Sequence, residues 1–523
     1  MIRINEIKVP EGSDTEHVKK KVAHLLRIDA SEIKDLKVLK CSKDARNRSS
    51  ILDVYSVSLS HKNEARIVKR AKRPNVILYS EETYRLPERR ESKSSLRPVV
   101  AGFGPAGIFT ALILAMAGEK PLVIERGKPV EERVGDIERF FEKGVLDPDS
   151  NAQFGEGGAG TFSDGKLSTG IKDRAGRKDF ILKTLIKHGA DEAILTSKHP
   201  HIGSDRLISI IPSLRRELES YGGEIRFCTA LTSIDAEGGA LKRICVKNDK
   251  EEWIECSDLF LCLGHSARDT VKMLYDSGLS MEAKAFAVGV RAEHARGMID
   301  DAMGYKSASY KLTYHCRDGR GIYSFCMCPG GYVINASSEP GHLVVNGMSL
   351  SARDAANSNS AIVCTVTPSD YASYGSDPLS GIGFQRDLEK KAYEECGGSI
   401  PYQRFEDFTR NLTSESFGHI RPCCKGRYGM GNIRNILPDS ISDDIIEAMS
   451  SFSGRIQGFD DGDTLFAAIE SRTSSPVRIL RGEDMQSVSI RGIYPAGEGA
   501  GYAGGIMSAA IDGMKAAETY ISG

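Results

Sequence analysis

The stretch VVAGFGPAG, residues 99–107, decides the fold of this chain. It predicts a short buried strand, a glycine turn and the start of a helix. Gly102, Gly104 and Gly107 have the G-x-G-x-x-G spacing of a dinucleotide-binding turn. The first glycine lets the chain turn sharply, the second lets a pyrophosphate approach the backbone, and the third lets the helix pack on the sheet. The helix N-terminus then offers free N–H groups and a positive dipole end to phosphates.

The residues that follow strengthen this interpretation. Ala111–Gly118 continues as an apolar helix, and Pro121–Gly127 predicts a second strand that contains Glu125, 18 residues past Gly107. A ribose-binding carboxylate belongs at about this place, and an acid there favours a ribose with a free 2′-OH. Arg126 keeps a 2′-phosphate open as an alternative. The other alternative is a glycine-rich turn in an unrelated α/β protein.

Composition describes a globular protein of two or three domains. The chain has 523 residues, 40% hydrophobic and 27% charged, with a formal net charge of −1. The sequence contains no apolar run that could span a membrane, and MIRINEIKVPEG lacks a signal-peptide core, so a cytoplasmic location is expected. The 12 cysteines are scattered, which favours free thiols in a reducing compartment.

Residues 1–95 predict a separate basic domain with a βαββα order, which suggests a ferredoxin-like fold. Through Arg97 there are 23 Lys plus Arg against 14 Asp plus Glu, a net charge of +9, so the remainder carries about −10. Such a module could bind RNA or another polyanion. The lack of an aromatic-rich nucleic-acid motif favours a solvated charged face instead. The polar stretch Pro87–Pro98 predicts the linker.

The rest of the chain predicts an α/β domain in two parts. Residues 96–277 form the first part, which includes the glycine-rich run 151–170; this run either approaches a ligand or is a flexible surface loop. Residues 278–454 are rich in strand-like runs and predict an inserted β-rich substrate domain, without a second G-x-G-x-x-G fingerprint. Residues 455–523 return to the strand, glycine turn and helix pattern and should complete the first sheet.

These motifs resemble the glutathione-reductase-type FAD-binding (Rossmann) class. The dinucleotide fingerprint, the strand Leu259–Gly264 and the late motif YPAGEGAGYAGG occur in the order of that class, with Glu498 where it usually has Asp. Residues 96–523 resemble more narrowly an uncharacterised group of bacterial FAD-dependent dehydrogenases. The runs that carry this likeness are FGEGGAGTFSDGKL, YHCRDGRGIYSFCMCPGG, VVNGMS and ESRTSSPVRI.

The resemblance implies a non-covalent FAD. The first glycine loop should hold the pyrophosphate, Glu125 the ribose, and the backbone at residues 229–231 the adenine. The helix that starts near Gly504 should direct its N-terminus at the N1–C2=O side of the flavin. The residues expected to contact the cofactor are Gly102, Gly104, Pro105, Ala106, Gly107, Glu125, Arg126, Gly157, Gly158, Gly160, Ala230, Leu231, Gly264, Gly497, Glu498, Gly504, Gly505 and Ile506.

Candidate catalytic residues are cations that could position a carboxylate or carbonyl substrate. Arg291, His294 and Arg353 are the first candidates, and Arg472 and Arg478 are others. The alternative for each is a structural ion pair.

The cysteine pairs Cys326/Cys328 and Cys423/Cys424 are weaker redox candidates, because neither has the C-x-x-C or C-x-x-x-x-C spacing of a flavin-linked dithiol. The His199-Pro-His201 motif lacks surrounding ligands of metal-site spacing, so no metal is expected.

The predicted function is an FAD-dependent oxidoreductase that moves a hydride between flavin N5 and an unidentified small molecule. NAD(P)H would act as a transient electron donor, because no second nucleotide domain is predicted. The alternative is an RNA-associated flavoprotein that uses the basic N-terminal domain. The sequence leaves the substrate, the electron acceptor and the oligomeric state open.

Overall fold

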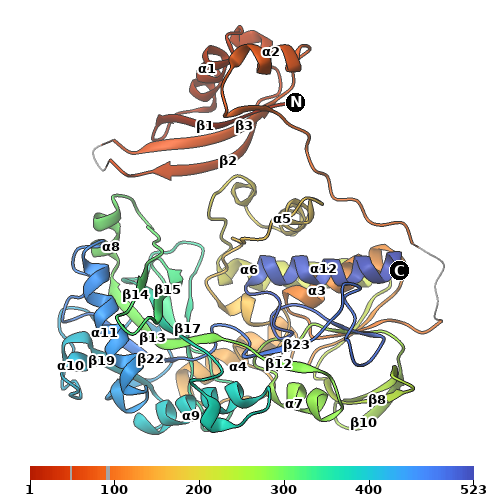
Figure 1. The fold of residues 1–523 in the computed structure, drawn as a ribbon, viewed down its shortest axis with the longest axis vertical. Coiled ribbons are helices and arrows are strands. Elements are labelled where there is room, and N and C mark those ends of the chain that lie inside the picture. Colours follow the sequence, from red (N-terminus) through yellow and green to blue (C-terminus); the bar gives the residue numbers. More distant parts are fainter. Residues whose placement is uncertain (48–49, 90–94) are drawn as a thin grey trace. The chain divides into compact units, whose positions relative to one another are not determined.

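The computed structural model describes residues 1–47, 50–89 and 95–523 (Figure 1). They form two compact units. The first contains residues 1–85, 166–202 and 303–306, and the second contains residues 86–165, 203–302 and 307–523. Part of the predicted linker Pro87–Pro98, residues 90–94, lies outside the described residues.

The first unit contains a four-stranded antiparallel sheet of order β2-β3-β1-β4. The predicted βαββα order is observed, and a short fourth strand follows it. Ile2 and Ile4 of β1 are buried, and so are Ile7 and Val9 after a shift in the pairing register with β3 between Ile4 and Ile7. The shift keeps the apolar side chains on the buried face. The elements are β1 (Ile2–Pro10), α1 (Thr15–Leu26), η1 (Ala30–Glu32), β2 (Lys37–Asp44), β3 (Leu52–Leu59), α2 (Glu64–Ala71) and β4 (Val76–Leu78).

Residues 166–202 pack with this sheet, although the sequence places them in the first part of the FAD-binding domain. They contain α5 (Arg177–Lys187) and η3 (Glu192–Leu195). The backbone of Cys41 on the edge strand β2 donates to Thr196 and accepts from Lys198, at 2.6 and 3.0 Å. The rings of Tyr84 and Phe180 lie 4.7 Å apart. Backbone pairing to an open sheet edge therefore joins this excursion to residues 1–85.

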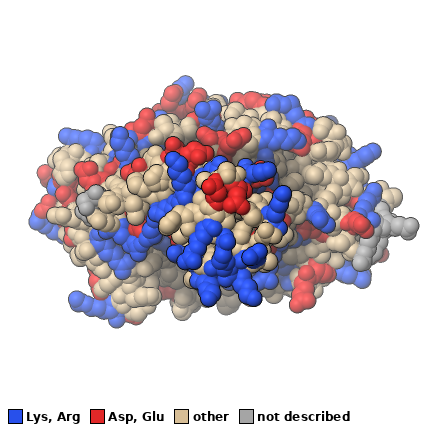
Figure 2. Space-filling model, turned by 90° about the horizontal axis from the view of Figure 1, so that it is seen from above, with Lys and Arg blue, Asp and Glu red and all other residues tan. Residues whose placement is uncertain are grey.

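Helices α1 and α2 carry much of the basic character of the first unit. Arg70 of α2 donates to the carbonyl groups of Leu26 and Arg27 at the end of α1, at 3.1 and 2.9 Å. A cation at a helix C-terminus also offsets the negative end of the helix dipole. Figure 2 shows Lys and Arg side chains gathered in the foreground, with Asp and Glu side chains among them. The surface in that view is thus basic but mixed in charge.

The second unit contains a five-stranded parallel sheet of order β24-β11-β5-β6-β7. The C-terminal strand β24 completes this sheet, as the sequence predicts. The strands are β5 (Val99–Ala101), β6 (Leu122–Ile124), β7 (Glu224–Arg226), β11 (Leu259–Leu261) and β24 (Ile493–Pro495). The helices of these segments are α3 (Pro105–Met116), α4 (Val130–Lys143), η2 (Ala159–Phe162), α6 (Ser204–Ser220), α7 (Arg268–Asp276) and α12 (Ile506–Ser522).

Three smaller sheets accompany the parallel sheet in the second unit. The first has the order β10-β9-β8; its strands are β8 (Ala230–Glu237), β9 (Ala240–Lys247) and β10 (Glu251–Glu255). The second pairs β12 (Met281–Ala283) with β23 (Val477–Ile479). The third has the order β17-β16-β20 and contains β16 (Tyr332–Asn335), β17 (Val345–Met348) and β20 (Cys424–Lys425).

A seven-stranded sheet forms the β-rich part of the second unit, in the order β14-β15-β18-β13-β22-β19-β21. Its strand β22 lies beyond the predicted domain boundary at Gly454, yet it pairs with β13 and β19 in the middle of the sheet. The strands are β13 (Phe286–Ala295), β14 (Thr313–His315), β15 (Gly321–Cys328), β18 (Asn357–Val366), β19 (Ile400–Arg404), β21 (Tyr428–Met430) and β22 (Leu465–Glu470). The helices of this part of the chain are α8 (Arg296–Met303), η4 (Ala372–Tyr374), α9 (Ser380–Glu395), α10 (Phe405–Thr409), η5 (Ile433–Asn435) and α11 (Asp439–Ser453).

Helices α3 and α12 pack on each other at very short range (Figure 1). A Cβ atom at Gly513 of α12 would lie 2.4 Å from the carbonyl oxygen of Ala106 on α3. Only glycine allows this approach. Within the described residues, none of the helices has both the length and the apolar character needed to cross a bilayer.

Replacing Gly513 with alanine should therefore destabilise the protein by about 1–3 kcal/mol, because the added methyl group forces the two helices apart. The matched control is Gly135→Ala in the middle of α4, where no described atom lies within 4 Å of the new Cβ. This control should leave stability unchanged or raise it slightly, since alanine is the better helix former. The midpoint of urea unfolding measures both changes. Equal midpoints for the two variants would contradict the packing argument.

Candidate functional site

The carboxyl edge of the parallel sheet contains a topological switch point. From β5 the chain adds β6 and β7 on one side, and it later adds β11 and β24 on the other side. In open α/β sheets, ligands bind outside the carboxyl ends of the strands where the order reverses. The loops that follow β5, β11 and β24 begin at Gly102, Cys262 and Ala496. These three loops form the candidate site.

The three fingerprint glycines have different steric surroundings. A Cβ at Gly102, where φ is +98°, would lie 2.6 Å from the carbonyl oxygen of Cys262. A Cβ at Gly107 would lie 1.9 Å from the carbonyl oxygen of Gly102. A Cβ at Gly104 would be 3.6 Å from its nearest neighbour, Gly158, which is an ordinary contact. The protein itself thus requires glycine at 102 and 107, whereas its own packing leaves room for a methyl group at 104.

Glu125 holds three backbone segments together. Its carboxylate accepts hydrogen bonds from the N–H groups of Phe103, Gly127 and Gly155, at 2.7, 2.9 and 3.0 Å. The side chain is 5% exposed. A carboxylate has about four acceptor positions, so capacity for the predicted ribose contact is left. The N–H of Thr229 donates to the Glu125 carbonyl at 2.9 Å, which places the predicted adenine segment, residues 229–231, beside Glu125.

Arg126 is committed to the protein rather than to a 2′-phosphate. Its guanidinium contacts Asp269 at 2.5 Å and lies over the ring of Phe154, 4.8 Å from the ring centre. Burial alone would raise the pKa of Asp269, but the neighbouring Arg126 lowers it below its usual range. The ion pair therefore favours a ribose without a 2′-phosphate.

The glycine-rich run lies directly on the fingerprint loop. The N–H of Gly157 donates to the carbonyl of Phe103 at 2.9 Å. A Cβ at Gly158 would lie 2.9 Å from the Cα of Gly104, and one at Gly160 would lie 3.0 Å from Ile506 of α12. Residues 155–160 are thus fixed between the starts of α3 and α12, and the flexible-loop alternative does not describe them.

Arg133 of α4 holds this run and is absent from the residues predicted from sequence. Its fully buried guanidinium donates to the carbonyl groups of Asn151, Gly155, Glu156 and Gly158, at 2.7–3.3 Å. Burial lowers the pKa of Arg133 to about 10, so it remains charged at neutral pH. The signal in the sequence is an arginine in the apolar helical spacing of Val130, Ile137 and Phe140.

Replacing Arg133 with methionine should release this run, because several buried carbonyl groups lose their only charged donor. We expect faster hydrogen–deuterium exchange in a peptide that spans residues 151–160. Arg139→Met on the same helix is the control, since the Arg139 side chain is about half exposed and donates to Asp136 rather than to the glycine-rich run. Unchanged exchange in R133M would contradict the role of Arg133.

The third loop joins β24 to α12. Gly497, at φ +82°, donates its N–H to Asp512 at 2.8 Å, and Arg481 pairs with the same carboxylate at 2.8 Å. Glu498 lies 3.2 Å from Nδ1 of His265 in the loop after β11, so its side chain is directed at a residue that the sequence did not single out. The cofactor contact expected of Glu498 stays a prediction.

Space remains open around the three loops. A Cβ at Gly264, Gly504 or Gly505 would meet no described atom within 4 Å. Gly505, at φ +78°, is the N-cap of α12, and Ile506 is its first residue. The orphan N–H groups at the start of this 17-residue helix therefore border open space, as an anion-stabilising helix end requires.

Two of the predicted catalytic residues, Arg291 and His294, are buried and bind neighbouring protein groups. Arg291 on β13 is fully buried and donates to Glu470 at 3.0 Å and to Asn359 at 2.7 Å. His294 on the same strand is also fully buried; its Nε2 lies 2.8 Å from the Phe459 carbonyl and its ring packs on the Phe459 ring. Burial lowers the pKa of His294 to about 4, so it is neutral at pH 7. The ion-pair alternative describes Arg291, and catalysis by either residue stays a prediction.

Arg353 lies elsewhere, next to the glycine-rich run. It adopts a left-handed backbone, φ +50°, and its guanidinium is 3.7 Å from Asp164. Ser349 donates to Asp164 at 2.5 Å. The structure thus brings Arg353 close to Asp164 of the glycine-rich run, whereas Arg291 and His294 make their contacts inside the seven-stranded sheet and with Phe459.

Comparisons with known proteins agree with a flavin-related family. Residues 285–473 match the model of the family described as "FAD-dependent protein, C-terminal domain-like". Residues 1–60 match a domain of unknown function, DUF8436. A protein of Clostridium beijerinckii described as uncharacterized is 42% identical over 531 residues, which covers 99% of this chain and 98% of that protein. This chain belongs to the same family.

Solved structures give weaker likenesses. The E. coli quinol fumarate reductase subunit FrdA has a TM-score of 0.38 at 10% identity, with 82% of this chain and 70% of that chain covered. The glycerol-3-phosphate dehydrogenase of Bacillus halodurans, solved with FAD, has a TM-score of 0.33 at 11% identity, with 82% and 65% covered. The flavin-dependent brominase Bmp2 has a TM-score of 0.36 at 12% identity, with 81% and 79% covered.

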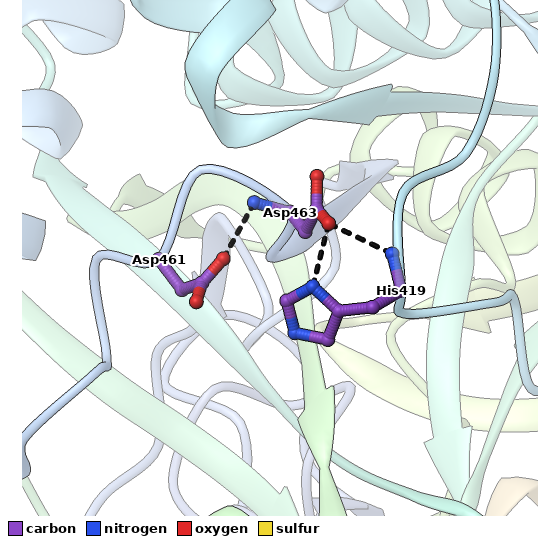
Figure 3. A group of neighbouring side chains, drawn as sticks. All are labelled: His419, Asp461 and Asp463. Atoms are coloured by element: carbon purple, nitrogen blue, oxygen red, sulfur yellow. Dashed lines mark hydrogen bonds and ion pairs between the residues drawn. The ribbon is translucent and has the colours of Figure 1, made fainter.

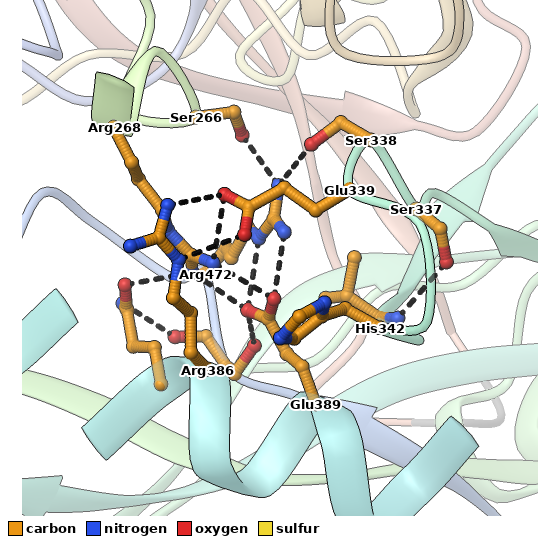
Figure 4. Close-up of polar contacts among 12 residues, drawn as sticks. Ser266, Arg268, Ser337, Ser338, Glu339, His342, Arg386, Glu389 and Arg472 are labelled. Atoms are coloured by element: carbon orange, nitrogen blue, oxygen red, sulfur yellow. Dashed lines mark hydrogen bonds and ion pairs between the residues drawn. The ribbon is translucent and has the colours of Figure 1, made fainter. Parts of the chain in front are cut away.

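A buried Arg–Glu–Arg cluster joins α7, α9 and the segment after β22 (Figure 4). Glu389 accepts from Arg268 at 2.7 and 2.9 Å and from Arg472 at 2.7 and 2.9 Å. Burial opposes ionisation of Glu389, but the two guanidinium groups lower its pKa far below the usual range. Arg472 is therefore a structural partner, and Arg478 likewise pairs with Glu282 at 3.0 Å.

The cysteine pairs differ in their surroundings. All 12 cysteines are free thiols. Cys328 lies 3.8 Å from a guanidinium nitrogen of Arg291, yet burial raises its pKa well above the usual value. Burial also raises the pKa of Cys424, to about 12. Burial raises the pKa of Cys423 as well, so Cys328, Cys423 and Cys424 lack the low-pKa thiolate that thiol redox chemistry uses.

His419, Asp461 and Asp463 come together on the β-rich part of the second unit (Figure 3). Asp463 accepts from the backbone N–H of His419 at 2.7 Å and lies 2.6 Å from its ring Nδ1. Arg404 contacts the other Asp463 oxygen at 2.7 Å. Both oxygens of Asp463 are thus paired with protein donors, and a cation nearby would meet repulsion from Arg404.

Glu293 on β13 makes stability depend on pH. It is fully buried and accepts from Tyr402, from Asn357 at 2.8 Å and from the Cys423 N–H at 3.0 Å. Burial raises its pKa to about 7, above about 4.3 for an unfolded chain. The protonated form is favoured in the folded state, so its stabilising contribution is complete below about pH 4.3 and is lost as the pH rises through about 7.

Glu293→Gln should therefore flatten the fall in stability between pH 5 and pH 8, because the amide cannot ionise. The denaturation midpoint at several pH values measures this slope. Glu415→Gln at an exposed position is the control and should keep the wild-type slope. A wild-type slope in E293Q would show that Glu293 does not titrate in this range.

Proposed function

We propose that this chain is an oxidoreductase that binds FAD non-covalently and exchanges a hydride with a small-molecule substrate at flavin N5. The observation that carries the proposal is the contrast among the three fingerprint glycines. Packing explains Gly102 and Gly107, while Gly104 has room for a methyl group. A ligand backbone that approaches Gly104 accounts for glycine there. The match of residues 285–473 to an FAD-dependent family supports the same cofactor.

The residues at the carboxyl edge fit such a group. The start of α3 at Pro105 and the start of α12 at Ile506 offer orphan N–H groups to a pyrophosphate and to a second acceptor. Glu125 keeps acceptor capacity for a ribose hydroxyl, and Arg133 rigidifies the loop over Gly104. Open space at Gly264 and Gly504 gives a ring system access to this edge. When bound, FAD would supply the two-electron chemistry, and these residues would bind and orient it.

The electron donor and the substrate are less defined. The sequence has one dinucleotide fingerprint, and Gly104 assigns it to FAD. We therefore propose that NAD(P)H has no nucleotide-binding domain of its own and visits the substrate site transiently. The matches to known proteins give no support to the RNA-associated alternative.

The test begins with the absorbance spectrum of the full chain and an anaerobic titration with NADH and with NADPH. A flavin band that bleaches with either nucleotide is the expected result. A flavin band that ignores both would overturn the role of NAD(P)H only. Absence of a flavin band, even after incubation with FAD, would overturn the proposal.

Gly104→Ala sharpens this test. The variant should keep wild-type stability, because its methyl group meets the protein at 3.6 Å, but its FAD affinity should fall by about tenfold or more. Gly135→Ala on α4 is the matched control and should bind FAD normally. Fluorescence titration of the apoprotein with FAD measures both affinities. Wild-type affinity in G104A would remove the argument from Gly104.

A further inference from the structure

We propose that His265 is a catalytic residue, which carries at Nε2 the proton that accompanies hydride transfer, and that Glu498 is its positioning residue. This inference rests on the proposed function. It deepens that function by naming the group that handles the proton.

The place of His265 in the fold is the first observation. It follows β11, one of the two strands that flank the switch point, and it directly follows Gly264, beside which space is open. The loop after β24 supplies Glu498, and that loop leads to the open space at Gly504 and Gly505. The histidine thus lies where open α/β sheets hold the reacting part of their ligands.

The two ring nitrogens of His265 have different surroundings. Nδ1 lies 3.2 Å from Oε1 of Glu498. Nε2 is buried and has no hydrogen-bond partner among the described residues. The side chain is 11% exposed and Nε2 itself is buried, so bulk water does not hydrogen-bond to this nitrogen. A buried nitrogen without a partner is costly, and a ligand group that exchanges a proton with it removes that cost.

Glu498 selects the tautomer. In neutral His265, a proton on Nδ1 donates to the carboxylate and leaves the Nε2 lone pair free as a base. When Nε2 takes up a proton, the imidazolium pairs with the same carboxylate.

The charged groups around His265 come from several elements. Glu498 faces it from the loop after β24. Burial raises the pKa of Glu470 on β22, while Arg291 and, to a smaller extent, His265 oppose that rise. Arg291 of β13 pairs with Glu470. Lys284 interacts electrostatically with both Glu498 and Arg478. Glu470 is thus already neutralised by Arg291, which leaves Glu498 as the carboxylate that pairs with His265.

The step balances for a hydroxyl/carbonyl or amine/imine couple. In the oxidation, the C–H bond breaks and its hydride leaves with two electrons for the bound FAD. The O–H or N–H bond breaks, its proton goes to Nε2 of His265, and its electron pair forms the new C=O or C=N bond. The reverse direction returns the proton from Nε2 to the heteroatom.

The test uses the FAD-loaded full chain and needs no known substrate. A base at this site should also take up a proton when the bound FAD is reduced chemically. The midpoint potential of the bound FAD is measured against pH, which counts the protons taken up per two electrons. Wild type should take up more protons than His265→Gln in the range where histidine titrates. His315→Gln, at an exposed position on β14, is the control and should match wild type.

Glu498→Gln is the second variant. It should keep proton uptake by His265 but move it to lower pH, because the imidazolium loses its partner charge. Nitrogen-15 NMR of the 11 histidines in oxidised and reduced wild type gives an independent readout that does not depend on a variant folding. One histidine should change protonation on reduction.

The outcomes separate this inference from the proposed function. A wild-type chain that binds no FAD would overturn the proposed function. A chain that binds FAD and shows equal proton uptake in wild type and H265Q, or no histidine that changes in the NMR spectra, would overturn the role of His265 alone. An unshifted profile in E498Q would overturn the positioning role of Glu498.

Discussion

Direct contact between backbones, without side chains between them, is the constraint on which the second unit depends. Gly107 brings the first turn of α3 against the carbonyl of Gly102, and Gly513 brings α12 against the carbonyl of Ala106. Both contacts would be impossible with any Cβ atom. The first sets the distance between α3 and the turn that follows β5, and the second sets the distance between α3 and α12. The starts of these helices, which face the candidate site, are therefore placed by sterics rather than by polar contacts.

Buried charge then fixes the loops that sterics leave free. Glu125 gathers the N–H groups of three segments, and Arg133 gathers the carbonyl groups of the glycine-rich run. Arg268, Glu389 and Arg472 do the same for α7, α9 and the segment after β22. A buried ion pair adds little net stability after desolvation, but breaking one is costly. These groups thus select one arrangement of the chain more than they stabilise it.

The same logic distinguishes structural from reactive polar groups. Arg291 and Glu470 pair with each other inside the seven-stranded sheet, and burial keeps His294 neutral. Nδ1 of His294 also lacks a hydrogen-bond partner among the described residues, but the ring is fully buried within that part of the unit. At the carboxyl edge of the parallel sheet, Glu498 and His265 satisfy each other on one side only, and Nε2 keeps its capacity. A buried ring nitrogen without a hydrogen-bond partner, next to open space at Gly264, distinguishes this edge from the interior of the seven-stranded sheet.

The sequence by itself determined the local geometry of the fingerprint, because G-x-G-x-x-G spacing depends on residues within one turn of helix and one strand. It also determined the pairing of the last strand with the first sheet, through a repeated strand, turn and helix pattern. Arg133, His265 and the place of β22 were decided by the tertiary structure. The acceptors of Arg133 lie 18 to 25 residues away, and Glu498 lies 233 residues from His265. No local pattern encodes such partners, because folding alone brings them within hydrogen-bond distance.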